Sequence, residues 1–272
     1  MPVNDELGKR MKEYYEQVPK TRLVRRMPVA IRIDGKAFHT FTKGFQKPFD
    51  RILILAMQNT MQKLCENIQG CIFGYTQSDE ITLILKDYNK LNTSAWFDYE
   101  VQKMCSIAAS MATLYFNEEF RTLLNTTMEG KDGISEVDIA HMCARDKGAM
   151  FDARCFNVPK EEVANLIYWR QTDAYRNSRQ MAGQAYFSSK ELSGKSCTEI
   201  VEMLKEKKGI DFDNDYSSYE KYGTVCYKST WFDYEENGET RRPYWVTTAW
   251  DRLMNATDRE FIQDIVNSVE EG

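Results

Sequence analysis

Two aspartates in this sequence stand at the expected ends of β-strands. Asp34 follows an apolar run at residues 29–33, and Asp79 lies in the short polar connection between two β-rich runs at residues 71–75 and 81–85. Two such runs with a tight connection predict a β-hairpin. If the first strand neighbours this hairpin in one sheet, the two carboxylates converge, and they repel each other unless a cation such as Mg²⁺ lies between them. A pair of shared Mg²⁺ ions would support an in-line substitution at phosphorus.

Each motif, taken alone, has a simpler interpretation as a polar turn. The segment between the two motifs favours the functional interpretation, in which the aspartates bind a cation. Apolar residues recur every three or four positions from residue 50 to residue 67, which predicts a helix with Asp50 as its N-cap. Strand, helix and hairpin in this order are typical of a polymerase or nucleotidyl-cyclase palm, although an analogy of fold does not fix the reaction. The predicted fold class is α+β: an antiparallel palm sheet with helices packed on one face, and a C-terminal α/β extension.

The residues between the first strand and the helix are of types that bind anions. A sharp turn after Gly35 would aim successive backbone N–H groups at a phosphate, and Lys36 and Lys47 would add positive charge. The sequence therefore predicts a phosphate-binding loop beside the two aspartates.

These motifs, in this order, resemble those of the tRNA-His guanylyltransferase family of 3′–5′ RNA polymerases. The motifs nearest the aspartates are Arg-Ile-Asp-Gly-Lys-x-Phe-His at 32–39, Lys-Pro-x-Asp at 47–50 and Ser-Asp-Glu at 78–80. Further along are a Ser-containing helix at 103–116, Phe-Asp-x-Arg at 151–154 and Trp-Arg-Gln at 169–171. The resemblance extends from residue 5 to residue 190 and is weak beyond residue 196.

The resemblance implies roles for the residues of these motifs. It implies two Mg²⁺ ions held by Asp34, Asp79 and the Gly35 carbonyl, with Glu80 as a further catalytic acid. Because adjacent strand residues face opposite sides of a sheet, Glu80 can instead point away from the ion that Asp79 binds. The implied nucleotide-binding residues are Lys36, Ala37, Phe38, His39, Lys47 and Ser78.

The reaction implied by the resemblance is nucleotidyl transfer onto the 5′ end of tRNA. ATP first activates the 5′-phosphate by adenylylation, and the 3′-hydroxyl of GTP or another nucleoside triphosphate then attacks it, so one two-metal centre can serve both steps. Eukaryotic members carry Asp-Cys-His-Ile-Asn-Asn where this chain has Asp-Ala-Tyr-Arg-Asn-Ser at 173–178. We therefore expect the guanylyltransferase-like branch and template-dependent repair of truncated tRNA, with non-templated addition of G to tRNA-His as the alternative.

Two other functions are compatible with the paired acids. A palm-type nucleotide cyclase shares them, although the basic segments and the Trp-Arg-Gln helix argue against it. A non-catalytic RNA-binding module could retain them as a structural metal site. Replacing either aspartate by alanine distinguishes an enzyme from such a module, because only the enzyme loses turnover.

The charge distribution limits how RNA can be bound. The chain has 36 Lys and Arg residues against 41 Asp and Glu residues, a net charge of −5 at pH 7. This excludes a uniformly basic surface, so local clusters must contact the phosphates. One cluster lies within residues 20–26, and another follows Trp-Arg-Gln. The predicted RNA-binding residues are Arg25, Arg26, Arg170, Arg176, Asn177 and Arg179.

Length and composition set the remaining expectations. The 272 residues are predicted to form a palm-like catalytic domain over 1–190, with an excursion near 120–147, and an extension over 191–272 packed on it. Residues 223–231 and 241–248 alternate as a second hairpin does. The seven cysteines include no Cys-x-x-Cys pair, which favours reduced thiols in a cytoplasmic protein. The sequence shows no signal-peptide core and no apolar segment of membrane-spanning length, so we expect no membrane partner. The resemblance adds a homotetramer as the expected assembly.

Overall fold

A single antiparallel sheet forms the centre of the molecule. The computed structural model describes residues 5–235 and 238–268, and its six strands lie in the order β4-β1-β3-β2-β5-β6. They are β1 (Val29–Gly35), β2 (Cys71–Gln77), β3 (Glu80–Leu85), β4 (Phe151–Asn157), β5 (Thr224–Glu235) and β6 (Gly238–Thr248). The predicted antiparallel palm sheet is confirmed, and the hairpin β2–β3 pairs with β1 as expected.

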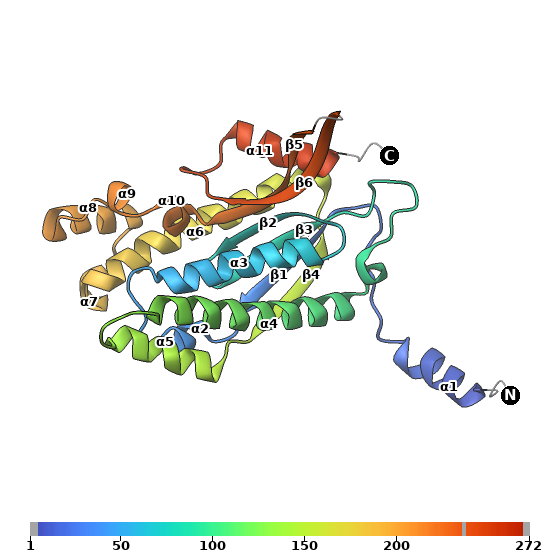
Figure 1. The fold of residues 1–272 in the computed structure, drawn as a ribbon, viewed down its shortest axis with the longest axis horizontal. Helices are drawn as coiled ribbons and strands as arrows, with labels where there is room; N and C mark the ends of the chain where they lie inside the picture. Colours follow the sequence, from blue (N-terminus) through green and yellow to red (C-terminus); the bar gives the residue numbers. More distant parts are fainter. Residues whose placement is uncertain (1–4, 236–237, 269–272) are drawn as a thin grey trace.

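Helices cover both faces of this sheet (Figure 1). The first face packs against α3 (Arg51–Asn67) and α4 (Val101–Met128), and the second against α6 (Val163–Tyr186) and α11 (Ala256–Asn267). The expectation of helices on one face was therefore wrong in this detail. The physical reason is visible in β1, where Val29, Ala30 and Ile31 are all fully buried, because a strand covered on both faces is apolar on both.

Shorter helices connect or extend these layers. They are α1 (Glu6–Met11), α2 (Phe38–Phe41), α5 (Glu136–Lys147), α7 (Ser189–Leu192), α8 (Cys197–Lys208), α9 (Phe212–Asp215) and α10 (Ser218–Tyr222). Single helical turns occupy Lys12–Glu16, Trp96–Tyr99 and Lys160–Glu162. α1 lies apart from the body at the end of an N-terminal arm (Figure 1). The predicted excursion near 120–147 is mostly helical, because α4 continues to Met128 and α5 packs against it.

The C-terminal third contributes to the same sheet. β5 pairs with β2, so the second predicted hairpin is confirmed and its strands extend the palm; residues 236–237 of its turn lie outside the described residues. A separate cluster that includes Ala182, Leu204 and Phe212 packs α8 and α9 against the C-terminal half of α6. Within the described ranges, no helix is long and apolar enough to cross a membrane.

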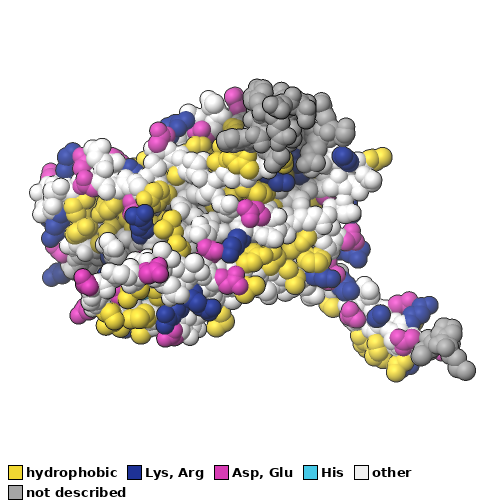
Figure 2. Space-filling view, in the orientation of Figure 1, with side chains coloured by type: hydrophobic (Ala, Val, Ile, Leu, Met, Phe, Trp, Pro, Cys, Tyr) yellow, Lys and Arg dark blue, Asp and Glu magenta, His cyan; other side chains and the backbone are white. Residues whose placement is uncertain are grey.

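The visible surface carries no large basic field. In Figure 2, Lys and Arg side chains alternate with Asp and Glu side chains over the body. This pattern agrees with the net charge of −5 and means that an anionic partner must be recognised by particular side chains.

Candidate functional site

The chain segments that carry Asp34 and Asp79 meet at one end of the sheet. Asp34 is opposite Glu80 in the β1–β3 register. The Gly35 N–H donates a hydrogen bond of 3.0 Å to the Asp79 carbonyl. Ser78 forms the hairpin tip with a left-handed φ of 54°, which a non-glycine residue seldom adopts outside turns and functional loops. Strand pairing and the tight tip thus bring the segments that carry the two aspartates to one end of the sheet, near enough for the charge of Asp34 to raise the pKa of Asp79.

The Asp79 carboxylate is electrostatically disfavoured in the isolated protein. Burial raises its pKa above the ordinary value, and the negative charges of Asp34 and Glu80 raise it further. A hydrogen bond of 3.0 Å from the Ser78 hydroxyl partly offsets these effects. A divalent cation beside Asp79 would remove the penalty, because it stabilises the charged form.

The donors available here fit Mg²⁺. They are two carboxylates and the Gly35 carbonyl, all hard oxygen ligands, and the described residues include no cluster of three or more His, Cys, Asp or Glu side chains able to hold a metal. A dedicated all-protein cage is therefore not present in the described ranges. Mg²⁺ usually binds through one or two carboxylates together with water and substrate phosphates, so an open set of this kind suits it.

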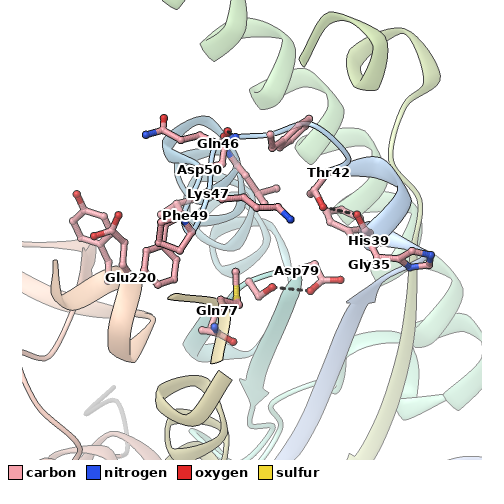
Figure 3. Close-up of a pocket in the computed structure, with 18 of the residues that line it drawn as sticks. Gly35, His39, Thr42, Gln46, Lys47, Phe49, Asp50, Gln77, Asp79 and Glu220 are labelled. Carbon is pink, nitrogen blue, oxygen red and sulfur yellow. Dashed lines mark hydrogen bonds between the residues drawn. The ribbon is translucent and has the colours of Figure 1, made fainter. Parts of the chain in front are cut away.

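A hollow of about 500 Å³ opens beside Asp79 (Figure 3). This volume is within the ordinary range for a small-molecule site. Five of the predicted nucleotide-binding residues line the hollow, namely Ala37, Phe38, His39, Lys47 and Ser78. Figure 3 shows the Lys47 side chain extending into the space above Asp79. Lys36, also predicted, is exposed but does not line the hollow.

The loop after β1 presents free backbone donors. The Gly35 and Lys36 N–H groups are occupied by the carbonyls of Asp79 and Met150, at 3.0 and 2.8 Å. In the described part of the chain, the next three N–H groups, of residues 37–39, have no acceptor. Ala37 holds a left-handed φ of 55° that starts α2. Three successive free donors in such a turn form a concave site for an anion.

Aromatic packing fixes this loop. Phe38 is 5% exposed, and its ring lies 5.6 Å from that of Phe116 and 5.2 Å from that of Phe151, between centroids. A Cβ added at Gly35 would lie 2.2 Å from the Phe38 ring, so only glycine fits there. Phe38 therefore anchors the loop with its side chain.

Glu80 faces the opposite side of the sheet from the hollow and contacts α6. Its carboxylate accepts hydrogen bonds of 2.6 and 2.9 Å from Arg170 and lies 3.2 Å from Arg32. The Glu80 and Arg170 side chains are only 14% and 12% exposed. The geometry thus commits Arg170, predicted to bind RNA, and Glu80, predicted to be catalytic, to one internal ion-pair network.

The other predicted RNA-binding residues fall in two places. The Arg25 guanidinium pairs with Asp98 at 3.1 Å and also pairs with Asp87, whose second oxygen accepts the Arg26 N–H. The residues on α6 are more available. Arg176 pairs with Asp173 and keeps a 58% exposed side chain, Arg179 lies over the Tyr175 ring at 4.2 Å, and Asn177 is half-buried between them.

Several pocket residues were not foreseen. Met181 of α6 lines the hollow, as do Tyr219 and Glu220 of α10 in the C-terminal third, and no motif included these three residues. Asp152 lies opposite Asp34 in the β1–β4 register and pairs with Arg154 at 2.9 Å. The Phe-Asp-x-Arg motif did contain Asp152, and strand pairing shows why it belongs to this end of the sheet.

A buried histidine supports the wall of the hollow. The His141 Nε2 lies 2.8 Å from Asp50 Oδ2, and the two side chains are 5% and 4% exposed. Asp50 also accepts the Leu53 N–H as the N-cap of α3 and the Gln46 N–H. Because an ionised carboxylate only accepts, Nε2 is the donor. His141, to which the sequence assigned no role, thus holds the segment 46–50 in place.

We expect replacement of His141 by Ala to lower the free energy of unfolding by about 2 kcal/mol, since a hydrogen bond to a charged group and a packed ring are lost. The KM for the nucleoside triphosphate expected from the sequence should rise more than kcat falls, because Gln46 and Asp50 line the hollow. Urea unfolding and steady-state kinetics measure both. His141→Gln, which can still donate to Asp50, is the matched control, and an unchanged KM in His141→Ala would contradict the role.

Comparisons with known proteins agree with this geometry. A family model described as tRNAHis guanylyltransferase matches residues 8–159. The chain is 36% identical to a bacterial tRNA(His) guanylyltransferase-like protein solved in complex with ATP, with a TM-score of 0.76, covering 96% of this chain and 98% of that one. A bacterial protein of the same description, solved in complex with GTP, is 34% identical with a TM-score of 0.75, and the match covers 97% of this chain and 100% of that one. The tRNA(His) guanylyltransferase of Saccharomyces cerevisiae shares the fold at 21% identity and a TM-score of 0.61, over 85% of this chain and 95% of that one.

Proposed function

The chain belongs to the tRNA(His) guanylyltransferase family of nucleotidyltransferases, and on this premise we propose that it adds nucleotides to the 5′ end of truncated tRNA in a template-dependent reaction. The observation that carries the proposal is the meeting of the segments that carry Asp34 and Asp79 at one end of the sheet, where Asp79 lines a hollow that offers three free N–H groups. Carboxylates for cations and amides for phosphates are the two requirements of nucleotidyl transfer.

ATP and GTP are the proposed occupants of the hollow, since the bacterial relatives were solved with these nucleotides. The free N–H groups of residues 37–39 bind the triphosphate, and Lys47 neutralises part of its charge. The aromatic wall that includes Phe38 and Phe45 restricts water on one side. Asp34, Asp79 and the Gly35 carbonyl would hold two Mg²⁺ ions, which supply charge neutralisation at the reacting phosphate when bound.

In the proposed reaction, a 5′-phosphate oxygen of the RNA bonds to the α-phosphorus of ATP and pyrophosphate leaves. The 3′-hydroxyl oxygen of the incoming nucleotide then bonds to the activated 5′-phosphorus and AMP leaves. No side chain forms a covalent intermediate, so the protein contributes positioning and electrostatic stabilisation. Asp79 lines the hollow and Asp34 lies on the neighbouring strand β1, which suits both steps at one centre.

Two observations support the repair branch. Identity and TM-score are higher for the two guanylyltransferase-like bacterial proteins than for the Saccharomyces cerevisiae enzyme. The α6 segment at residues 173–178 also lacks the His and one Asn of the eukaryotic run, and Arg176 instead pairs with Asp173 there. This departure from the eukaryotic run argues against non-templated addition of G to tRNA-His.

We expect 5′-monophosphorylated tRNA lacking its first nucleotide to be extended with a kcat/KM at least roughly tenfold above that of full-length tRNA-His, a difference of about 1.4 kcal/mol in transition-state binding. The assay contains Mg²⁺, ATP and each labelled nucleoside triphosphate in turn. The added base should follow the opposite template base when that base is changed. A preference for full-length tRNA-His, or addition of G regardless of template, would contradict repair, and a cyclic nucleotide formed without RNA would indicate a cyclase.

A further inference from the structure

A row of aromatic side chains paired with arginines lies along the outer side of α6. We call it the α6 aromatic surface and define it by Tyr168, Trp169, Tyr175, Arg176 and Arg179. Guanidinium groups lie over all three rings, at 4.1 Å for Arg259 over Tyr168, 4.7 Å for Arg170 over Trp169 and 4.2 Å for Arg179 over Tyr175. Alternating aromatic and cationic groups are typical of surfaces that bind single-stranded nucleic acid.

Trp169 is the most unusual member of this surface. Its side chain is 53% exposed, whereas no other tryptophan whose side chain the structure describes is exposed to this degree. Trp169 lines two hollows of about 390 and 450 Å³. A large aromatic side chain normally gains stability by burial. The Arg170 guanidinium lies over part of this ring, and the exposed remainder, which lines two hollows, is available for a flat ligand.

The surface lies next to the catalytic acids. Trp169 precedes Arg170, whose guanidinium binds Glu80, and Glu80 follows Asp79 at the hairpin tip. Further along the same helix, Met181 lines the nucleotide hollow. The tip of β2–β3 therefore separates the nucleotide hollow from the α6 aromatic surface, and a strand on that surface can present its end to Asp79.

Charge favours an anionic ligand here. Arg176 and Arg179 line the hollow on one side of Trp169, together with a single acid, Asp173. The pair Arg176–Asp173 is largely exposed on the arginine side, and exposed ion pairs contribute little to stability. Arg176 can therefore exchange Asp173 for a phosphate at small cost.

We propose that Trp169 is the stacking platform for the unpaired 5′-terminal base of the RNA substrate, and that Arg176 and Arg179 bind the phosphates beside it. The proposal rests on the proposed function, because that function supplies the RNA. Trp169 presents the ring face, which accepts any base, and the arginines supply the charge. The 5′-phosphate attached to the stacked base then lies toward the hairpin tip that carries Asp79.

The test is equilibrium binding of a short 5′-monophosphorylated single-stranded oligoribonucleotide with a 3′ fluorophore, followed by anisotropy without nucleoside triphosphate. We expect Trp169→Leu to weaken binding roughly tenfold, because stacking on one base is lost. Trp169→Phe keeps an aromatic face and should stay within about threefold of wild type. The unlabelled oligonucleotide should quench tryptophan fluorescence in the wild type, and this quenching should disappear in Trp169→Phe although binding persists.

Tyr15→Leu is the matched control, since Tyr15 is a 66% exposed aromatic residue on the N-terminal arm. It should bind the oligonucleotide as wild type does. Wild-type affinity in Trp169→Leu, quenching that persists in Trp169→Phe, or no binding by the wild type would each overturn the proposal. A lower melting temperature of Trp169→Leu with unchanged affinity would show that the ring only covers the Glu80–Arg170 pair.

The tRNA-extension assay separates this proposal from the proposed function. If Trp169→Leu extends truncated tRNA with the KM of wild type, the stacking site is refuted and the enzymatic function stands. If the wild type extends no tRNA but binds the oligonucleotide through Trp169, the function is refuted and the stacking site stands.

Discussion

Asp79→Asn is expected to lower kcat for the proposed 5′-nucleotide addition by at least about a thousandfold, because the charge of one carboxylate proposed to hold Mg²⁺ is lost and such charge stabilisation contributes several kcal/mol to the transition state. The neutral amide keeps the size of the side chain and can still accept the Ser78 hydroxyl. Asp34→Asn should have an effect of the same order. Single-turnover addition of labelled nucleotide to truncated tRNA is the measurement, since it isolates the chemical step.

The same substitution is expected to raise the melting temperature when no divalent cation is present. The pKa of Asp79 is raised by burial and by Asp34 and Glu80, so the folded state binds its proton more tightly than the unfolded state. The contribution of Asp79 to the free energy of unfolding therefore falls as the pH rises from the ordinary aspartate range through the raised pKa. At neutral pH the ionised carboxylate destabilises the folded state by the full penalty. A neutral asparagine side chain carries no such penalty, so Asp79→Asn removes it.

Calorimetry with and without Mg²⁺ completes this experiment. Mg²⁺ should raise the melting temperature of the wild type, because an ion that binds only the folded state stabilises it by mass action. Mg²⁺ should raise the melting temperature of Asp79→Asn much less. Full activity in either asparagine variant, or an equal Mg²⁺ shift in wild type and variant, would contradict a metal role for these aspartates and favour a non-catalytic module.

The second large effect is expected at Glu80. Glu80→Ala should lower the free energy of unfolding by about 3 kcal/mol, because it leaves Arg170 and Arg32 without their shared carboxylate in a mostly buried place. The Nε of Arg32 is already buried without a partner, so the loss of Glu80 adds to an existing deficit of acceptors. Denaturant unfolding at pH 7 measures the loss.

A double-variant comparison identifies the cause. Replacing both partners, Glu80→Ala with Arg170→Met, should cost less than Glu80→Ala alone, since removing both charges avoids an unpaired one. If Glu80 acts mainly through this ion-pair network, Glu80→Ala should lose little activity at a temperature where this variant is folded. An activity loss as large as that of Asp79→Asn, with stability unchanged, would instead show that Glu80 is itself a catalytic acid.

The local structure around the site could be read from the sequence because short-range forces fix it. The runs at 29–33, 71–75 and 81–85 are strands, and Asp50 caps α3, as their periodicity and cap chemistry indicate. Gly35 was recognisable as the turn residue, although the reason is the Phe38 ring against it. Motif order also identified the family, since the spacing of acids, glycine and lysine reflects one arrangement of strand, loop and hairpin.

Tertiary structure alone decided what each charged side chain contacts. A strand sequence does not specify which face a neighbouring helix covers, so only the packing of α6 on the second face shows that Glu80 binds Arg170. The contribution of Tyr219 and Glu220 to the hollow, and the contact between His141 and Asp50, join segments far apart in the chain. Such contacts depend on the path of the whole chain, because side-chain partners over long separations are set by global packing and not by local propensity.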